Sequence, residues 1–116
     1  MFDFEKFDIY LKAELYHEEI LSLLKDSAFD PFLRDQIKRA STSILLNVAE
    51  GAGRFSKNDK KNFYIIARGS VFECVSILRI LKRQKVMADN QYDNFYFKLE
   101  ELAKMLTGLI KSLSNI

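Results

Sequence analysis

Four long stretches of this chain place apolar residues at steps of three and four, and three short interruptions separate them. The interruptions are Asp30-Pro31, the run from Gly51 to Ser56, and the residues just before Asp89. Such a period indicates α-helices with one buried face. Because only four Gly and one Pro are available for turns, the connections must be short. The pattern therefore predicts an all-α, antiparallel up-and-down four-helix bundle, formed as a single domain over residues 1–116.

The interruptions also predict where each helix begins. The first helix is expected from about residue 5 to 27. Asp30 caps the second helix and Pro31 takes its first position, with the end near Gly51. Ser56 begins the third, and Asp89 caps the fourth. The period also predicts the inner face of each helix. In the first helix it consists of Tyr10, Glu14, His17, Leu21 and Leu24, and in the second of Leu33, Ile37, Ala40, Ile44, Val48 and Gly51. In the third it consists of Phe63, Ile66, Ala67, Ser70, Cys74, Ile77 and Leu81, and in the fourth of Tyr92, Phe95, Tyr96, Leu99, Leu102, Ala103, Leu106, Leu109, Ile110 and Leu113.

Two of these helices carry apolar residues on the outer side as well. Leu46 lies opposite the predicted inner stripe of the second helix, and Ile65 and Phe72 lie opposite that of the third. Because burying one Phe stabilises by about 2–3 kcal/mol, these positions favour self-association; scattered exposed apolar residues are the alternative. Gly69 lies in mid-helix, where close helix packing is expected to compensate its poor propensity.

The positive charge gathers in the middle of the chain. Residues 1–33 have a net charge of −5, whereas residues 34–85 have +8. Clustered cations favour contact with the phosphates of RNA or DNA, and Phe55 and Phe72 are suited to stack on bases. The alternative is a subunit interface in which these cations face the acidic first helix of a neighbour. The candidate nucleic-acid-binding residues are Lys38, Arg39, Arg54, Lys57, Lys60, Lys61, Arg68, Arg79, Lys82 and Arg83.

The stretch from Gln36 to Glu73 carries a recognisable signature. Its pieces are Gln36-Ile37-Lys38-Arg39-Ala40, Ser43-Ile44, Asn47-Val48-Ala49-Glu50-Gly51, Gly53-Arg54, Phe63, Ala67-Arg68-Gly69-Ser70 and Glu73, with Asp8-Ile9-Tyr10 and Lys12-Ala13 upstream. The chain resembles the four helix bundle protein family, which includes the proteins encoded in intervening sequences of bacterial 23S ribosomal RNA. That family is related to the accessory proteins of diversity-generating retroelements. The resemblance implies a ring-like homopentamer associated with nucleic acid, or a scaffold for a partner such as a reverse transcriptase.

The polar residues of the signature allow two interpretations. Gln36, Ser43, Asn47, Glu50 and Arg54 share one edge of the second helix, and Ser70 and Glu73 lie on the third. One interpretation is a structural network that fixes helix register, with an Asn47–Ser70–Glu73 hydrogen-bond set and with Arg54 neutralising Glu50 or Glu73. The other is a ligand or catalytic site built around the two glutamates.

Other chemistry has weak support in the sequence. Di-iron bundles need two Glu-x-x-His motifs, but Glu14 and His17 form one and the chain has one His; His17 is expected to bond Glu14 or a facing helix. Cys74 falls on an inner face, where thiols are inert, and Gly51-Ala52-Gly53 lacks the rest of a phosphate-binding loop. We expect no enzyme activity, cofactor, metal or small-molecule substrate. Without a secretory signal or a membrane-spanning run, a cytoplasmic location is expected.

Overall fold

The structure of the protein is a computed structural model that describes residues 1–26 and 28–114. Within this part of the chain, all regular structure is helical and no strand is present. The elements, in order, are the short 3₁₀ helix η1 (Asp3–Lys6), α1 (Asp8–Leu23), α2 (Pro31–Gly53), α3 (Lys57–Arg83) and α4 (Asp89–Ser112). The prediction of an all-α chain with four helices is therefore confirmed.

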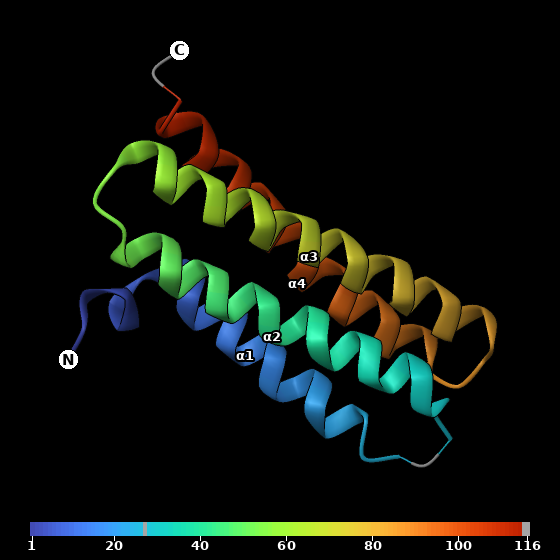
Figure 1. The fold of residues 1–116 in the computed structure, drawn as a ribbon. Coiled ribbons are helices and arrows are strands. Elements are labelled where there is room, and N and C mark those ends of the chain that lie inside the picture. The colour runs from blue at the N-terminus through green and yellow to red at the C-terminus, as the bar shows by residue number, and fades with distance from the viewer. Residues whose placement is uncertain (27, 115–116) are drawn as a thin grey trace.

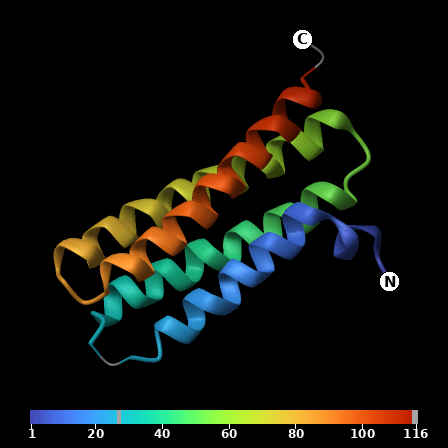
Figure 2. The same cartoon turned by 180° about the vertical axis from the view of Figure 1, so that it is seen from behind.

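The four α-helices pack side by side into an elongated molecule of 44 × 31 × 22 Å (Figure 1). Each helix lies beside two others: α1 packs on α2 and α4, and α3 packs on the same two helices. Among the described residues the backbones of α1 and α3 are not neighbours, so these helices occupy opposite corners of the bundle and meet through core side chains such as Tyr16 and Cys74. Figure 2 shows the same arrangement from behind, with α4 alongside α3 and α1 alongside α2.

Two helix starts are those that the sequence predicts. The Asp30 carboxylate accepts hydrogen bonds from the backbone N–H groups of Phe32 and Leu33, at 2.8 and 3.2 Å, and Pro31 is the first residue of α2. The Ser56 hydroxyl accepts a bond from the Asp59 N–H at 3.1 Å and so begins α3. Both caps satisfy donors that the first helical turn leaves without partners.

Two boundaries differ from the prediction. Phe7 has an extended backbone, so the α-helix starts at Asp8, and the preceding residues form η1 instead. The first helix ends at Leu23, before the expected limit of residue 27, which itself lies outside the described residues. The cap of α4 is Ala88, whose N–H donates to the Gln91 side chain at 2.9 Å; Asp89 is the first helical residue and does not act as the cap.

The buried face of α1 is rotated from the predicted one, whereas the faces predicted for α3 and α4 are confirmed in part. Glu14 and His17, on the predicted face of α1, are only half-buried at its edge, and Ile66, on the predicted face of α3, is exposed. On α4, Tyr96 is exposed. In α1 the buried stripe lies one position before the predicted one. In α3 the predicted Ala67, Cys74, Ile77 and Leu81 are buried, and in α4 so are the predicted Phe95, Leu99, Leu102 and Leu106. The buried stripes are Ile9, Ala13, Tyr16 and Ile20 in α1, and Tyr64, Ala67, Val71, Cys74, Ile77, Leu78 and Leu81 in α3. The stripe predicted for α2 is confirmed from Ile37 to Gly51, whereas Leu33 is half-buried.

The surplus apolar residues do face outward. Leu46, Ile65 and Phe72 are all exposed. Gly69 also differs from its expectation, because a Cβ added there would meet no atom within 4 Å. None of the described residues therefore packs closely on Gly69, so no contact among them offsets the cost of a mid-helix glycine.

Candidate nucleic-acid interface

The ten candidate cations lie along α2, along α3 and at the turn between these helices. Lys38 and Arg39 are on the first half of α2, and Arg79, Lys82 and Arg83 are on the last turns of α3. Figure 1 shows that α2 begins at the end of the bundle where α3 finishes, so these five cations share one end of the α2–α3 layer. Arg54, Lys57, Lys60 and Lys61 lie at the opposite end.

At this first end, four of the five cations are available to a partner. Lys38, Arg39, Arg79 and Arg83 are exposed and form no ion pair with any described residue. The fifth, Lys82, places its ammonium 4.3 Å from the centre of the Tyr92 ring. An exposed, unpaired cation keeps its full charge for a phosphate and sacrifices no existing salt bridge when it binds.

At the turn between α2 and α3 the cations have structural contacts. Arg54 bonds the Glu50 carboxylate at 3.1 Å and lies 4.6 Å from the centre of the Phe63 ring. Lys60 donates to the carbonyl oxygen of Ala52 at 2.9 Å, near the end of α2, where cations favourably meet the helix dipole. Lys57 begins α3, and Lys61 is half-buried. The expected neutralisation of Glu50 by Arg54 is confirmed.

Two aromatic side chains expected to stack on bases have different surroundings. Phe55, in the turn, is fully exposed. Phe72 is partly covered, because the Arg68 guanidinium lies 4.5 Å from its ring centre and is held there by a bond from Arg68 Nε to Thr107 Oγ1 at 3.0 Å. A base is therefore able to approach Phe55 freely, but one face of Phe72 is already occupied.

The polar residues of the signature meet through Ser43, which lies on the predicted polar edge of α2 but was not expected in the hydrogen-bond set. The Ser43 hydroxyl accepts from Asn47 Nδ2 at 3.0 Å on its own helix and from the Ser70 hydroxyl at 2.7 Å across the α2–α3 contact. Asn47 and Ser70 are thus joined through Ser43, not directly. Glu73 makes no hydrogen bond or ion pair with a described residue, so it is not a member of the expected set. The step of four from Ser43 to Asn47 was the available signal.

A polar hollow opens beside this network. It is lined by Gln36, Arg39, Ala40, Ser43, Ser70 and Glu73. Glu50 lies elsewhere, at a hollow formed with Phe4, Leu46, Arg54 and Phe55. The two glutamates expected for a catalytic site therefore do not face a common cavity, and Glu50 is already paired with Arg54. Glu50 and Glu73 are therefore not placed to act together as an acid–base pair.

The remaining reactive side chains are held in structural positions. His17 Nδ1 lies 2.7 Å from the hydroxyl of the buried Ser41, so the expected bond to a facing helix is confirmed. Burial lowers the pKa of His17 and keeps its ring neutral. Burial also raises the pKa of the Cys74 thiol to about 12, so the nucleophilic thiolate is suppressed. Among residues 1–26 and 28–114, no group of three His, Cys, Asp or Glu side chains is placed to hold a metal ion.

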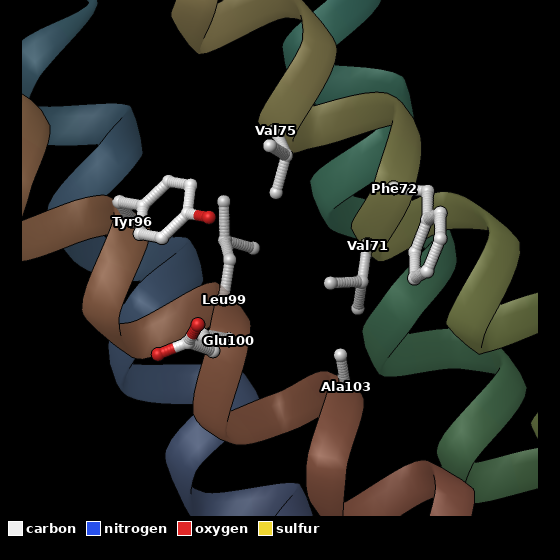
Figure 3. Close-up of a pocket in the computed structure, with 7 residues that line it drawn as sticks. All are labelled: Val71, Phe72, Val75, Tyr96, Leu99, Glu100 and Ala103. Carbon is white, nitrogen blue, oxygen red and sulfur yellow. The ribbon is translucent and has the colours of Figure 1, made fainter.

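An apolar hollow lies between α3 and α4, with a volume of about 280 Å³. Figure 3 shows side chains from the two helices facing each other across it, with Tyr96 and Leu99 from α4 opposite Val71 and Val75 from α3. Glu100 is the one charged residue in its lining. None of the described helices is long and apolar enough to cross a membrane.

Comparison with known proteins accounts for this combination of fold and signature. The chain matches the 23S rRNA-intervening sequence protein family over residues 5–108. It belongs to that family. A similar solved structure is a protein of unknown function from the S23 ribosomal protein family of Bacteroides thetaiotaomicron, with a TM-score of 0.85 and 26% sequence identity; the match covers 89% of this chain and 98% of that one. A search of the curated proteins found no match. The resemblance inferred from the Gln36–Glu73 signature is therefore confirmed.

Proposed function

We propose that this member of the 23S rRNA-intervening sequence protein family is a non-enzymatic, nucleic-acid-associated protein that acts as a ring-like homo-oligomer. Each subunit is one domain, an antiparallel up-and-down bundle, and the protein works in the cytoplasm. Basic residues of α2 and α3 contact the phosphate backbone of RNA or DNA. No base-reading motif is present, so binding follows charge and shape more than sequence.

The observation that carries this proposal is the set of exposed, unpaired cations at one end of the α2–α3 layer. Lys38, Arg39, Arg79 and Arg83 form no ion pair with a carboxylate of the described residues. In a homo-oligomer the same set repeats on every subunit, so weak phosphate contacts add through avidity. Phe55 and the cations of the turn, Arg54 and Lys57 among them, offer a second contact at the opposite end.

The salt dependence of RNA binding tests the proposal. Affinity for a short structured RNA is measured at salt concentrations from about 50 to 200 mM, a range in which a protein with several phosphate contacts loses orders of magnitude in affinity. Replacing Arg79, Lys82 and Arg83 by Glu is expected to weaken binding and to lower the slope of log K against log salt by about one per lost contact. The matched control replaces Lys6, Lys104 and Lys111, which are exposed elsewhere, by Glu and changes the net charge equally. Equal effects of the two triple variants would contradict a localised interface.

A specific observation favours a second function, a protein-interaction or structural oligomer with no nucleic-acid role. The outer side of α3 is apolar because it exposes Ile65, Ile66 and Phe72. Monomeric soluble proteins seldom leave a contiguous apolar surface uncovered. In that case the family's relation to retroelement accessory proteins suggests a scaffold for a partner such as a reverse transcriptase. The same triple reversal separates the two functions. Loss of RNA binding with intact assembly supports the first, whereas a broken oligomer with unchanged RNA binding supports the second.

A further inference from the structure

The outer side of α1 forms an apolar ridge with acidic flanks. Leu11 and Leu15, one turn apart, are 47% and 50% exposed. Glu14 and Glu18 lie on the same side of the helix and form no ion pair with a described residue. By contrast, Glu19 and Lys12, nearer to α4, are paired with Lys98 and Glu101. We define the α1 ridge as Leu11, Glu14, Leu15 and Glu18.

The outer side of α3 offers a surface of complementary shape. The hollow of Figure 3 runs along its α4 edge, with Phe72 at the rim. Two residues lie on the same side of α3 as Phe72, seven and three positions before it. They are Ile65, which is exposed, and Gly69, around which there is open space. A glycine between two bulky apolar residues leaves a depression on the helix surface into which a neighbouring side chain fits. We define the α3 socket as Ile65, Gly69, Phe72 and the hollow beside Phe72.

The charges of the two surfaces are also complementary. The Arg68 guanidinium lies over the Phe72 ring and forms no ion pair with a described residue. The α1 ridge carries two unpaired carboxylates, and the segments to which the surfaces belong have net charges of opposite sign. Two ridges brought face to face would place carboxylates together, and two sockets would place the Arg68 side chains together. The charges therefore favour the pairing of a ridge with a socket.

We infer that the α1 ridge of one copy of this chain docks in the α3 socket of a second copy, with Leu11 and Leu15 against Phe72 and Gly69 and with the ridge carboxylates near Arg68. Because α1 and α3 occupy opposite corners of the bundle, one chain presents both surfaces at once and cannot satisfy its own socket. The contact is therefore heterologous, so each added copy leaves a new free ridge and a new free socket until the assembly closes. This inference rests on the homo-oligomeric part of the proposed function and needs no nucleic acid.

Two surface variants block the two sides separately. Gly69→Trp fills the socket, and the isolated chain accepts it because nothing lies within 4 Å of the added side chain's origin. Leu11→Arg with Leu15→Arg removes the apolar side chains of the ridge, and the new arginines pair with Glu14 and Glu18, three residues on, and so compete with Arg68 for these carboxylates. Each variant is expected to be a monomer by light scattering at a concentration at which the unaltered chain is an oligomer. Gly69→Ala is the matched control for the socket, and Phe97→Ser, which removes an exposed apolar side chain from α4, is the control for the ridge; both are expected to remain oligomers.

A mixing experiment then tests the pairing itself. The Gly69→Trp chain keeps a normal ridge and the Leu11→Arg, Leu15→Arg chain keeps a normal socket, so an equimolar mixture is expected to give a one-to-one heterodimer that grows no further. A mixture that stays monomeric, or a Gly69→Trp chain that still assembles, overturns the inference, as does an unaltered chain that is a monomer. RNA is absent throughout. The salt-dependent RNA measurement therefore succeeds or fails independently of this result.

Discussion

The contact between Gly51 and Tyr64 at the α2–α3 turn provides the sharpest test of the packing described above. Gly51 is buried near the end of α2, and a Cβ added there would lie 2.7 Å from Cε1 and 3.0 Å from Cδ1 of the Tyr64 ring. Tyr64 is itself only 5% exposed, so its ring has little room to move. Gly108, near the end of α4, has no atom within 4 Å of the same position. Gly51→Ala and Gly108→Ala therefore make one chemical change in two opposite surroundings.

The expected free energies follow from two effects. Replacing a helical Gly by Ala stabilises by up to about 1 kcal/mol through helix propensity. Forcing an extra methyl group into a packed site costs about 1–3 kcal/mol. For Gly108→Ala the first effect acts alone, so the unfolding free energy rises. For Gly51→Ala the second dominates, which lowers the unfolding free energy by about 1 kcal/mol, so the two variants differ by about 2 kcal/mol.

Urea unfolding followed by circular dichroism measures this difference at one fixed protein concentration. With a slope near 2 kcal/mol per molar urea, the two midpoints should lie about 1 M apart, on opposite sides of that of the unaltered chain. A double-mutant cycle with Tyr64→Leu serves as the control, because removing the ring should remove most of the penalty at Gly51. Equal or greater stability of Gly51→Ala relative to Gly108→Ala would refute the close contact of α2 with the Tyr64 ring.

Three further predictions use the same unfolding assay or its thiol-labelling counterpart. Asp30→Ala should lower the unfolding free energy by about 1 kcal/mol, because the Asp30 carboxylate caps α2. Asp89→Ala, one position past the cap of α4, should lower it clearly less. Equal decreases in the unfolding free energy would contradict this assignment of caps. Burial lowers the pKa of His17, so near and below about pH 6.5 the unfolded chain binds more protons than the folded one. The unfolding free energy should therefore decrease as the pH is lowered from 7.5 to 5.5, and it should decrease less in His17→Gln. Because burial raises the pKa of Cys74 to about 12, the folded chain should resist a thiol reagent at pH 8 and react only once urea unfolds it, whereas rapid labelling of the folded chain would show an accessible thiolate.

The sequence was most informative where local chemistry decides the structure. Asp30, Pro31 and Ser56 begin their helices as predicted, because a cap requires only a side-chain oxygen within three residues of a free N–H. It was less informative at Asp89, where Ala88 and Gln91 form the start of α4 through a bond from backbone to side chain. A carboxylate at the first turn suits either position, so residue type alone did not distinguish them.

The choice of buried face needed the neighbouring helices. Two stripes in α1 are one position apart, and the one that includes Tyr10 and Leu21 appeared as regular as the one that includes Ile9 and Ile20. Packing against α2 and α4 selected the second. The partner of Ser70 was missed for the same reason, since the Ser43 hydroxyl reaches it only across an interhelical contact 27 residues apart in the chain.

For the candidate interface, the chain by itself determined which residues carry charge, which helices hold them, and that residues 1–33 and 34–85 have opposite net charge. These properties belong to residue type and helical period and need no partner. The tertiary structure alone decided that Arg68 is held by Thr107 and Lys82 lies over Tyr92 while Arg79 stays free, and that the α1 ridge and the α3 socket lie at opposite corners. Those facts depend on which side chains the packing of four helices brings within a few ångströms, and helical period does not encode that distance.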